Sequence, residues 1–337
     1  MGDILHALPA VTALRQAHPS WIIDWVVEPK WRALLSAPGA EGRGPAQPLV
    51  DRLHFAPTKE WRKAPLSRET IHALRQLRRT LRAGAYDTVL DLQGAIRSSV
   101  VARLTGSRRR IGEAEPREKP ARWLTNEHIS TSGAHVIEQG LELASAIAAD
   151  ELGPVLPVLP VCPAAEIWCD QLLAGSSAPV VLFNPGAGWG AKRWPAERYG
   201  EVAAALAAKG CRVFVNVGPG EEALAATVVE ATGGAALPLA ATLDQLIALT
   251  RRITLCIAGD TGPLHLACAF GKPVVGIYGP TDPGRNGPFG VPYRVLRSPL
   301  SRRDHTRHAD PEAGLLTIQP GQVLAAAEEL LAQEAAL

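Results

Sequence analysis

Residues 254–270, TLCIAGDTGPLHLACAF, contain the pattern that decides the fold. The apolar run over 254–258 predicts a buried strand, and the apolar spacing over 264–270 predicts a helix. Between them lies a loop with two glycines, Gly259 and Gly262, which permit a tight turn and a close approach of the backbone. A strand, a glycine-containing loop and a helix in this order form the repeating unit of a parallel α/β sheet.

The same unit recurs through the second half of the chain. Strands are predicted at 180–183, 212–216 and 274–277, and helices at 196–208, 221–231 and 243–251. The first half predicts a helix over 4–17 with Asp3 as its N-cap, strands at 21–27 and 86–92, and helices over 67–84 and 135–148. We therefore expect an α/β protein of two facing Rossmann-like domains with a ligand cleft between them.

Residues 152–163, LGPVLPVLPVCP, divide the two halves. Four prolines in this stretch cannot continue a helix or lie in a central strand, so an extended linker is expected. The predicted domains are 1–152 and 164–337, with the linker at 153–163. A doubly wound domain normally begins with a strand, so we also expect a central strand of about ten residues to precede Met1.

Composition narrows the classes of function. The net charge of +2 hides a basic stretch over 52–122, with 17 Lys or Arg against 7 Asp or Glu. This excess predicts an anionic partner. The alternative is an arginine-rich helix that is merely solvated, which would give the same excess of positive charge. The five cysteines lack metal or redox spacing, no acidic pair or histidine cluster recurs at ligand spacing, and there is no secretion signal or membrane-spanning run. We expect a cytoplasmic protein without a metal or cofactor.

Ligands of open α/β sheets bind beyond the carboxyl ends of the strands, so the loops leaving the strands are the candidate sites. In the loop 257–265, Asp260 is suited to accept hydrogen bonds from sugar hydroxyls, and the helix start after Thr261 and Gly262 is suited to phosphate oxygens. His265 lies one turn further and would line the same site. The alternative is that Asp260 or Thr261 simply caps the helix.

Three further loops carry candidate residues. The loop 184–195, NPGAGWGAKRWP, has Gly186, Gly188 and Lys192 in an order suited to a diphosphate, although a surface turn is the alternative. Glu222 follows a glycine turn, where it could accept from ribose hydroxyls or merely begin a helix. Asp3 at the first loop is either a general base or a helix cap.

Seven motifs in this order resemble glycosyltransferase family 9, the bacterial heptosyltransferases of lipopolysaccharide core assembly. They are MGDILHALP (1–9), DWVVE (24–28), WRK (61–63), YDTVLDLQG (86–94), KRWP (192–195), DTG (260–262) and YGPTDP (278–283). The resemblance runs nearly end to end and implies a GT-B fold, with the acceptor on the N-terminal domain and the donor on the C-terminal one. The segments 24–28 and 61–63 look most like heptosyltransferase I, whereas the loop GAGWG (186–190) looks closer to heptosyltransferase II.

The resemblance implies an inverting, metal-independent transfer of heptose from ADP-L-glycero-D-manno-heptose to the octulosonic acid (Kdo) of lipid A. Asp3 matches the proposed catalytic base, Lys192 the diphosphate-binding lysine, and Asp260, Thr261 and Gly262 the donor loop. The residues that match the anionic acceptor site are Lys59, Arg62, Lys63 and Arg117. The implied partners are the donor, Kdo-lipid A and the anionic inner leaflet, with peripheral attachment to the inner face of the inner membrane and no nucleic acid.

Three alternatives stay open at this stage. The chain could be another family 9 transferase, such as heptosyltransferase II or an autotransporter heptosyltransferase. It could also be a GT-B sugar-nucleotide epimerase, which needs no acceptor and no basic region, or a nucleotide-binding protein without catalysis. A Rossmann dehydrogenase is disfavoured, because no Gly-x-Gly-x-x-Gly follows a strand with an acidic residue suitably downstream.

Overall fold

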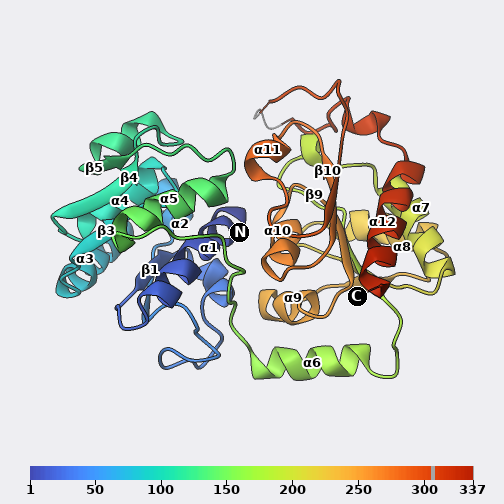
Figure 1. The fold of residues 1–337 in the computed structure, drawn as a ribbon, viewed down its shortest axis with the longest axis horizontal. Coiled ribbons are helices and arrows are strands. Elements are labelled where there is room, and N and C mark those ends of the chain that lie inside the picture. The colour runs from blue at the N-terminus through green and yellow to red at the C-terminus, as the bar shows by residue number, and fades with distance from the viewer. Residues whose placement is uncertain (305–307, 337) are drawn as a thin grey trace. The chain divides into compact units, whose positions relative to one another are not determined.

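A computed structural model describes residues 1–304 and 308–336. The chain forms two compact units, the first comprising Met1 and Asp3–Val161 and the second Gly2 and Cys162–Leu337 (Figure 1). Residues 151–162 contain no helix or strand, and Pro163 already begins a helix. Within the described ranges, no helix combines the length and the apolar character that crossing a membrane requires.

Unit 2 is built on one six-stranded parallel sheet. Its strand order is β11-β10-β9-β6-β7-β8, with every neighbouring pair parallel. The strands are β6 (Val180–Asn184), β7 (Arg212–Asn216), β8 (Leu237–Leu239), β9 (Leu255–Gly259), β10 (Val274–Tyr278) and β11 (Tyr293–Arg297). Strands β6, β9 and β10 are buried at every residue, as expected for a sheet covered on both faces.

Helices separate the strands of this sheet. They are α6 (Pro163–Leu173), α7 (Ala196–Ala208), α8 (Glu222–Ala231), α9 (Leu243–Thr250), α10 (Gly262–Ala269), α11 (Pro283–Asn286) and α12 (Pro320–Ala335), with short 3₁₀ turns η3 (Gly190–Lys192) and η4 (Leu315–Thr317). The four strands and four helices predicted for this half are confirmed, with ends that differ by one or two residues. The elements of this half that were not predicted from the sequence are α6, β8, α11, β11, α12 and the turns η3 and η4.

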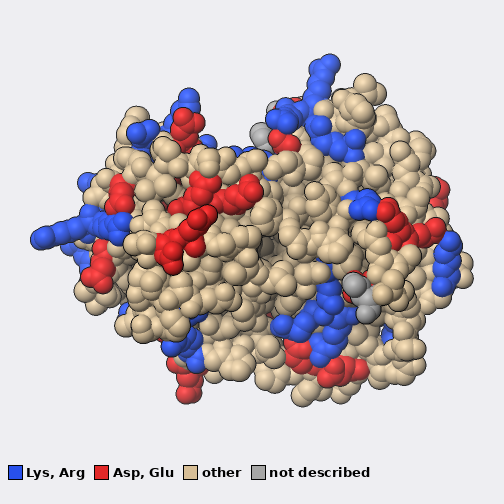
Figure 2. Space-filling view, in the orientation of Figure 1, with Lys and Arg blue, Asp and Glu red and all other residues tan. Residues whose placement is uncertain are grey.

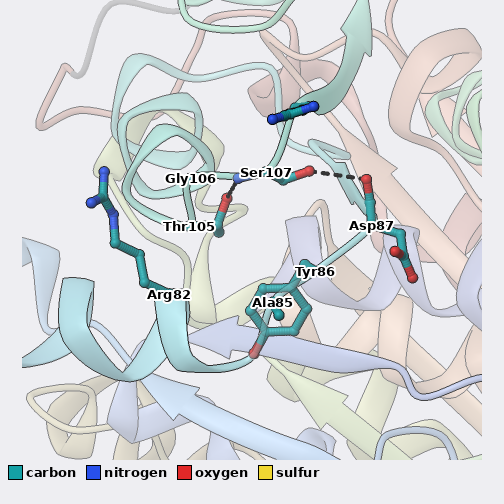
Figure 3. A pocket seen from close by; sticks show the side chains of 8 residues that line it. Arg82, Ala85, Tyr86, Asp87, Thr105, Gly106 and Ser107 are labelled. Carbon is teal, nitrogen blue, oxygen red and sulfur yellow. Dashed lines mark hydrogen bonds between the residues drawn. The ribbon is translucent and has the colours of Figure 1, made fainter.

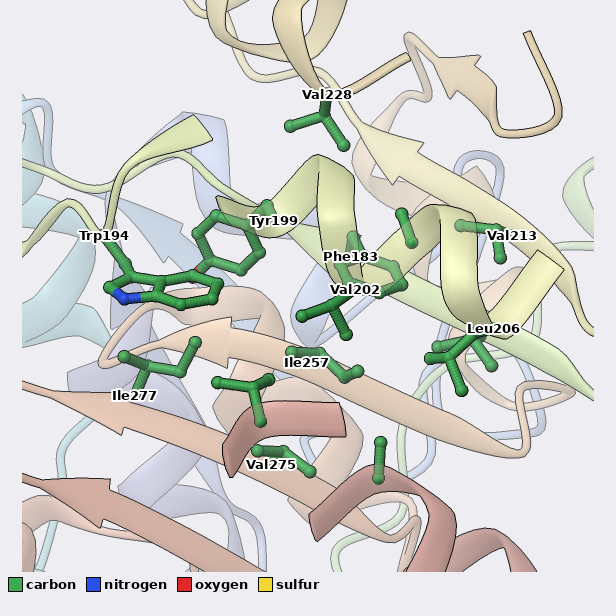
Figure 4. Packing of buried hydrophobic residues seen from close by; sticks show 14 of the residues in the cluster. Phe183, Trp194, Tyr199, Val202, Leu206, Val213, Val228, Ile257, Val275 and Ile277 are labelled. Atoms are coloured by element: carbon green, nitrogen blue, oxygen red, sulfur yellow. The ribbon is translucent and has the colours of Figure 1, made fainter. Parts of the chain in front are cut away.

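Trp194 is fully buried in the core of unit 2 (Figure 4). Its ring packs edge-to-face on Tyr199 with centroids 4.9 Å apart, and its Nε1 donates to the Ile318 carbonyl oxygen at 3.1 Å. Burial of a ring of this size stabilises by several kcal/mol, and the satisfied N–H removes the cost of burying a polar group. The tryptophan therefore anchors the KRWP segment to the core.

Unit 1 contains two separate parallel sheets. One pairs β1 (Asp24–Val27) with β2 (Arg52–Phe55), and the other has the order β3 (Thr88–Leu90), β4 (Arg109–Glu113), β5 (Glu127–Ile129). The helices are α1 (Gly2–Ala17), α2 (Thr58–Lys63), α3 (Arg68–Ala83), α4 (Ile96–Leu104) and α5 (Val136–Ala148), with 3₁₀ turns η1 (Pro29–Leu34) and η2 (Lys119–Trp123). The expected additional strand before Met1 stays a prediction.

Two local predictions for unit 1 need correction. Asp3 does not cap the first helix, because α1 begins at Gly2 with Met1 as the cap residue and Asp3 lies inside the first turn. The predicted strand at 86–92 is only three residues long. It ends before Asp91 because that carboxylate accepts from the backbone N–H groups of Gln93 and Gly94 and closes a turn there.

Candidate active site

A buried ion pair lies at the carboxyl end of β9. The Lys192 ammonium forms an ion pair with the Asp260 carboxylate, and also donates to the Asp260 carbonyl oxygen at 3.2 Å. The other carboxylate oxygen lies 2.9 Å from Nε2 of His265, one turn into α10. The two charged side chains are only 11% and 9% exposed. Lys192 and Asp260 are 68 residues apart in sequence, so only the folded sheet brings them together.

The surroundings keep Asp260 ionised. Burial alone would raise its pKa, but the hydrogen bond from His265 and the nearby Lys192 charge outweigh burial and lower the pKa well below the ordinary value. The carboxylate is therefore already occupied on both oxygens before any ligand arrives. Lys192 also lies over the Trp189 ring, 4.4 Å from its centroid, which fixes the ammonium further.

The structure contradicts the alternative that the side chain of Asp260 or Thr261 simply caps the helix. Thr261 is the cap residue of α10 but makes no side-chain cap, and its hydroxyl donates instead to the Gly259 carbonyl oxygen at 3.2 Å. Asp260 is engaged by Lys192 and His265. The N-terminus of α10 at Gly262 thus lies beside a lysine ammonium, and both favour an anion.

Asn184 ties the two glycine-containing loops together. Its side-chain amide donates to the Gly186 carbonyl oxygen at 2.9 Å and to the Thr261 hydroxyl at 3.3 Å, and its oxygen accepts from Asn216 at 2.7 Å. These buried bonds hold the ends of β6, β7 and β9 in one arrangement. Neither asparagine was a candidate site residue from the sequence, although Asn216 ends a predicted strand and Asn184 begins the loop 184–195.

Close backbone packing positions Lys192. A Cβ on Gly190 would lie 1.4 Å from the Ala309 carbonyl oxygen, so only glycine fits there. The next residue, Ala191, donates its N–H to the His308 carbonyl oxygen and accepts from the N–H of Glu312. Lys192 is therefore held between this packed turn and the Trp194 anchor, whereas Gly188 has open space around it.

Glu221 rather than Glu222 faces the loop of Gly186. A Cβ on Gly186 would lie 2.0 Å from the Glu221 carboxylate, which also accepts from the Gly218 N–H at 3.2 Å. Glu221 is partly buried, and this burial raises the pKa of its carboxyl group. Glu222, the residue selected from the sequence, is exposed and accepts from the Gly220 N–H at 3.2 Å.

Asp3 in unit 1 has polar and cationic neighbours. Its carboxylate accepts from Gln93 Nε2 at 2.7 Å, and the guanidinium groups of Arg97 and Arg117 lie 3.9 and 3.7 Å away. The side chain is 49% exposed, so a solvent-borne hydroxyl can reach it. Gln93 and Arg97 follow β3 directly, which places this cluster at the carboxyl end of the sheet. The structure thus joins Asp3 and Arg117, which the sequence placed in different roles.

The other predicted acceptor residues lie on α2. Lys59 donates its backbone N–H to Glu28 at 3.1 Å, and Arg62 and Lys63 are exposed at the end of the helix. Burial and the neighbouring Lys59 lower the pKa of Lys30. Lys30 and Lys59 are close enough for each to disfavour the other's positive charge. An anion would therefore be stabilised between them.

A cavity of about 600 Å³ in unit 1 lies elsewhere (Figure 3). Its lining residues precede β3 and β4, so it opens at the amino ends of the strands and not at the carboxyl ends, where ligands of such sheets bind. The Ser107 hydroxyl already donates to the Asp87 carbonyl oxygen at 3.1 Å, and its N–H donates to Thr105. Across the described residues, no group of three His, Cys, Asp or Glu side chains could hold a metal ion.

The chain is similar to known proteins over most of its length. The model of "Glycosyltransferase family 9 (heptosyltransferase)" matches residues 74–315. Lipopolysaccharide heptosyltransferase 1 of Escherichia coli K12 is 30% identical over 309 residues, covering 89% of this chain and 91% of that protein. Lipopolysaccharide heptosyltransferase 2 of the same strain is 28% identical and covers 100% of this chain and 97% of that protein.

Solved structures show the same relationship. The E. coli heptosyltransferase WaaC with ADP superposes with a TM-score of 0.77 at 27% identity, covering 98% of this chain and 97% of that one. The E. coli ADP-heptose lipopolysaccharide heptosyltransferase II gives a TM-score of 0.76 at 25% identity, covering 99% and 96%. Both relatives have the expected GT-B architecture of two Rossmann-like units. The chain belongs to glycosyltransferase family 9, the heptosyltransferases, and is a glycosyltransferase.

Proposed function

We propose that this enzyme transfers heptose from ADP-L-glycero-D-manno-heptose to the Kdo of lipid A in lipopolysaccharide core biosynthesis. The observation that carries the donor half is the Lys192 ammonium held at the N-terminus of α10 by a buried Asp260. A lysine and a helix N-terminus together suit a diphosphate. The similar WaaC structure contains ADP, and another solved heptosyltransferase structure contains an ADP-heptose analogue.

Each donor-site residue has a defined role in the proposal. Lys192 and the first N–H groups of α10 stabilise the negative charge that grows on the ADP leaving group. The loop with Gly186 and Gly188 lets the backbone approach the phosphates closely. Glu221, which packs on Gly186, accepts hydrogen bonds from ribose hydroxyls in place of the exposed Glu222.

Asp3 is the proposed general base. The acceptor hydroxyl gives its proton to the Asp3 carboxylate as its oxygen bonds to the anomeric carbon, and ADP leaves from the opposite face. One displacement of this kind inverts the configuration of the anomeric carbon. The transition state resembles an oxocarbenium ion, and no step requires a metal. Gln93 holds the carboxylate in place through its 2.7 Å hydrogen bond.

The cations around Asp3 support an anionic acceptor. Arg97 and Arg117 flank the carboxylate, and Lys59, Arg62 and Lys63 lie on α2 of the same unit. Guanidinium groups bind carboxylates and phosphates through paired hydrogen bonds, which fits the carboxylate of Kdo and the phosphates of lipid A. Peripheral attachment to the anionic inner leaflet of the inner membrane, in the cytoplasm, is part of the same proposal.

Turnover with defined acceptors tests the proposal. The purified enzyme is incubated with ADP-heptose and either Kdo-lipid A or Kdo-lipid A that already carries one heptose, in the presence of a chelator. We expect ADP release and a product one heptose heavier with the first acceptor. Transfer only to the heptosylated acceptor would assign the enzyme to the second heptose addition and would overturn the Kdo assignment. The loop GAGWG (186–190), which has no hydroxyl side chain and resembles heptosyltransferase II, favours that alternative.

A further inference from the structure

Three neighbouring helices of unit 1 form one cationic layer. Helix α4 connects β3 to β4 and η2 connects β4 to β5, so right-handed crossovers place both on the same face of this sheet. Helix α3 packs against α4, and α4 packs against η2. Together the three elements carry nine Lys or Arg and one acidic residue, Glu69.

Among the described residues, Arg97 is the one of these nine cations that forms an ion pair, with Asp3. Arg75, Arg78, Arg79 and Arg82 are all exposed on α3, and none forms an ion pair with another described residue. Acidic residues three or four positions away would stabilise such arginines within the helix, and α3 has none at those positions. The unpaired row therefore points to an anionic partner outside the chain.

Apolar side chains lie on the outward face of the same layer. Ile96 and Val100, one turn apart on α4, are 42% and 40% exposed, and Arg97 and Arg103 flank them on the same helix face. Trp123 at the end of η2 is 81% exposed. The Ile96 N–H donates to Glu118, which directly precedes η2, so the two apolar positions belong to one connected surface.

The opposite side of the sheet has the opposite charge. Helix α5 packs across β3, β4 and β5 and carries Glu138 and Glu142 but no lysine or arginine. No Lys or Arg occurs anywhere in residues 123–191. Figure 2 shows acidic side chains gathered over α5 on the face turned to the viewer. A dissolved anion can approach an enzyme from any side, so binding it would not require the cations to lie on one face of the sheet and the acidic residues on the other.

We infer that the outer face of α3, α4 and η2, the α3–α4–η2 surface, docks on an anionic lipid bilayer. Exposed arginines attract the headgroups, while Ile96, Val100 and Trp123 enter the interface, where a tryptophan ring is especially stable. Arg97 at the start of α4 lies 3.9 Å from the Asp3 carboxylate, so docking here places the proposed base beside the membrane. This inference rests on the proposed function, because a lipid-anchored acceptor must be met at a bilayer.

Vesicle binding of the full chain tests the charged part of the surface. The wild type should co-sediment with vesicles of phosphatidylglycerol and phosphatidylcholine, lose binding as salt rises, and ignore pure phosphatidylcholine. The double variant Arg78→Gln, Arg79→Gln should bind about 30-fold more weakly, since each cation near the surface contributes about five-fold. The matched control Lys209→Gln, Arg294→Gln removes two exposed cations from unit 2 and should bind like the wild type.

Removal of the apolar side chains tests the lipid assignment. Trp123→Ser should weaken vesicle binding about ten-fold, and Ile96→Ser with Val100→Ser should act in the same direction. The control Leu237→Ser in unit 2, whose side chain is also 42% exposed, should have no effect. If the serine variants bind as tightly as the wild type while the arginine variant does not, the surface binds a polyanion by charge alone and the bilayer assignment is wrong.

A deacylated, water-soluble acceptor separates this inference from the proposed function. All of these variants should transfer heptose to it at the wild-type rate, because none alters the Asp3 or Lys192 sites. Transfer without any vesicle binding would overturn the docking surface and leave the proposed function intact. Vesicle binding without heptose transfer would do the reverse.

Discussion

The Asp260→Asn substitution tests the buried ion pair most directly. The asparagine keeps the shape of the side chain but removes the charge that opposes Lys192, whose side chain is only 11% exposed. Removal of one partner from a buried pair costs about 3–5 kcal/mol, because the other charge stays buried without compensation. Lys192 keeps its contact with the carbonyl oxygen of residue 260 and its place over the Trp189 ring. These retained contacts reduce the cost of the unpaired charge by about 1–2 kcal/mol, so we expect a net loss of about 1–4 kcal/mol.

The loss should depend on pH in a defined direction. The pKa of Asp260 is lower in the folded protein than its ordinary value of 3.8, so the carboxylate contributes stability that is fully present above that value. The contribution disappears as the pH falls through the lowered folded pKa. The difference between wild type and Asp260→Asn should therefore be constant from about pH 5 to pH 8 and shrink below about pH 4.

Chemical denaturation followed by tryptophan fluorescence measures both effects. Asp170→Asn is the matched control, because it removes an exposed carboxylate, 2.8 Å from Arg252, in the same unit. An exposed pair of this kind is worth at most about 1 kcal/mol. If Asp260→Asn costs no more than Asp170→Asn at pH 7, or if its cost stays the same at pH 3, the ion pair does not stabilise the loop as argued.

The remaining predictions concern catalysis and the donor loop. Lys192→Met should lower kcat by about 10²–10³ through lost stabilisation of the leaving group, measured by ADP release; a change in KM alone would contradict this role. Asp3→Asn should lower transfer about 10³-fold while ADP binds as tightly as to the wild type, and retained transfer would eliminate Asp3 as the base. Glu221→Gln should weaken ADP binding about ten-fold through the loss of a charge-assisted hydrogen bond, whereas Glu222→Gln should not; titration calorimetry separates them, and equal effects would refute the exchange of roles. Gly190→Ala should lower the melting temperature by several degrees, because its methyl group would collide with the Ala309 carbonyl oxygen.

Local sequence patterns determined the central strands of unit 2. Strands β6, β9 and β10 are apolar runs buried at every residue, so they can be recognised without their neighbours. The proline-containing β8 and the less buried β11 lack this pattern and were missed. The same patterns located the loops of Lys192 and Asp260, because ligands of parallel sheets bind at the carboxyl ends of the strands. In unit 1 most strand residues are only partly buried, so these strands do not form the continuous apolar runs that mark a buried strand in the sequence.

Only the tertiary structure decided which side chains meet. Asp260 pairs with Lys192 across 68 residues, and Asp3 lies beside Arg97 and Arg117, because parallel strands bring the loops at one edge of a sheet together whatever their separation in the chain. The choice of Glu221 over Glu222 is equally non-local. Both follow the same glycine turn, and adjacent residues of a helix start point in different directions, so packing against Gly186 alone selects one of them.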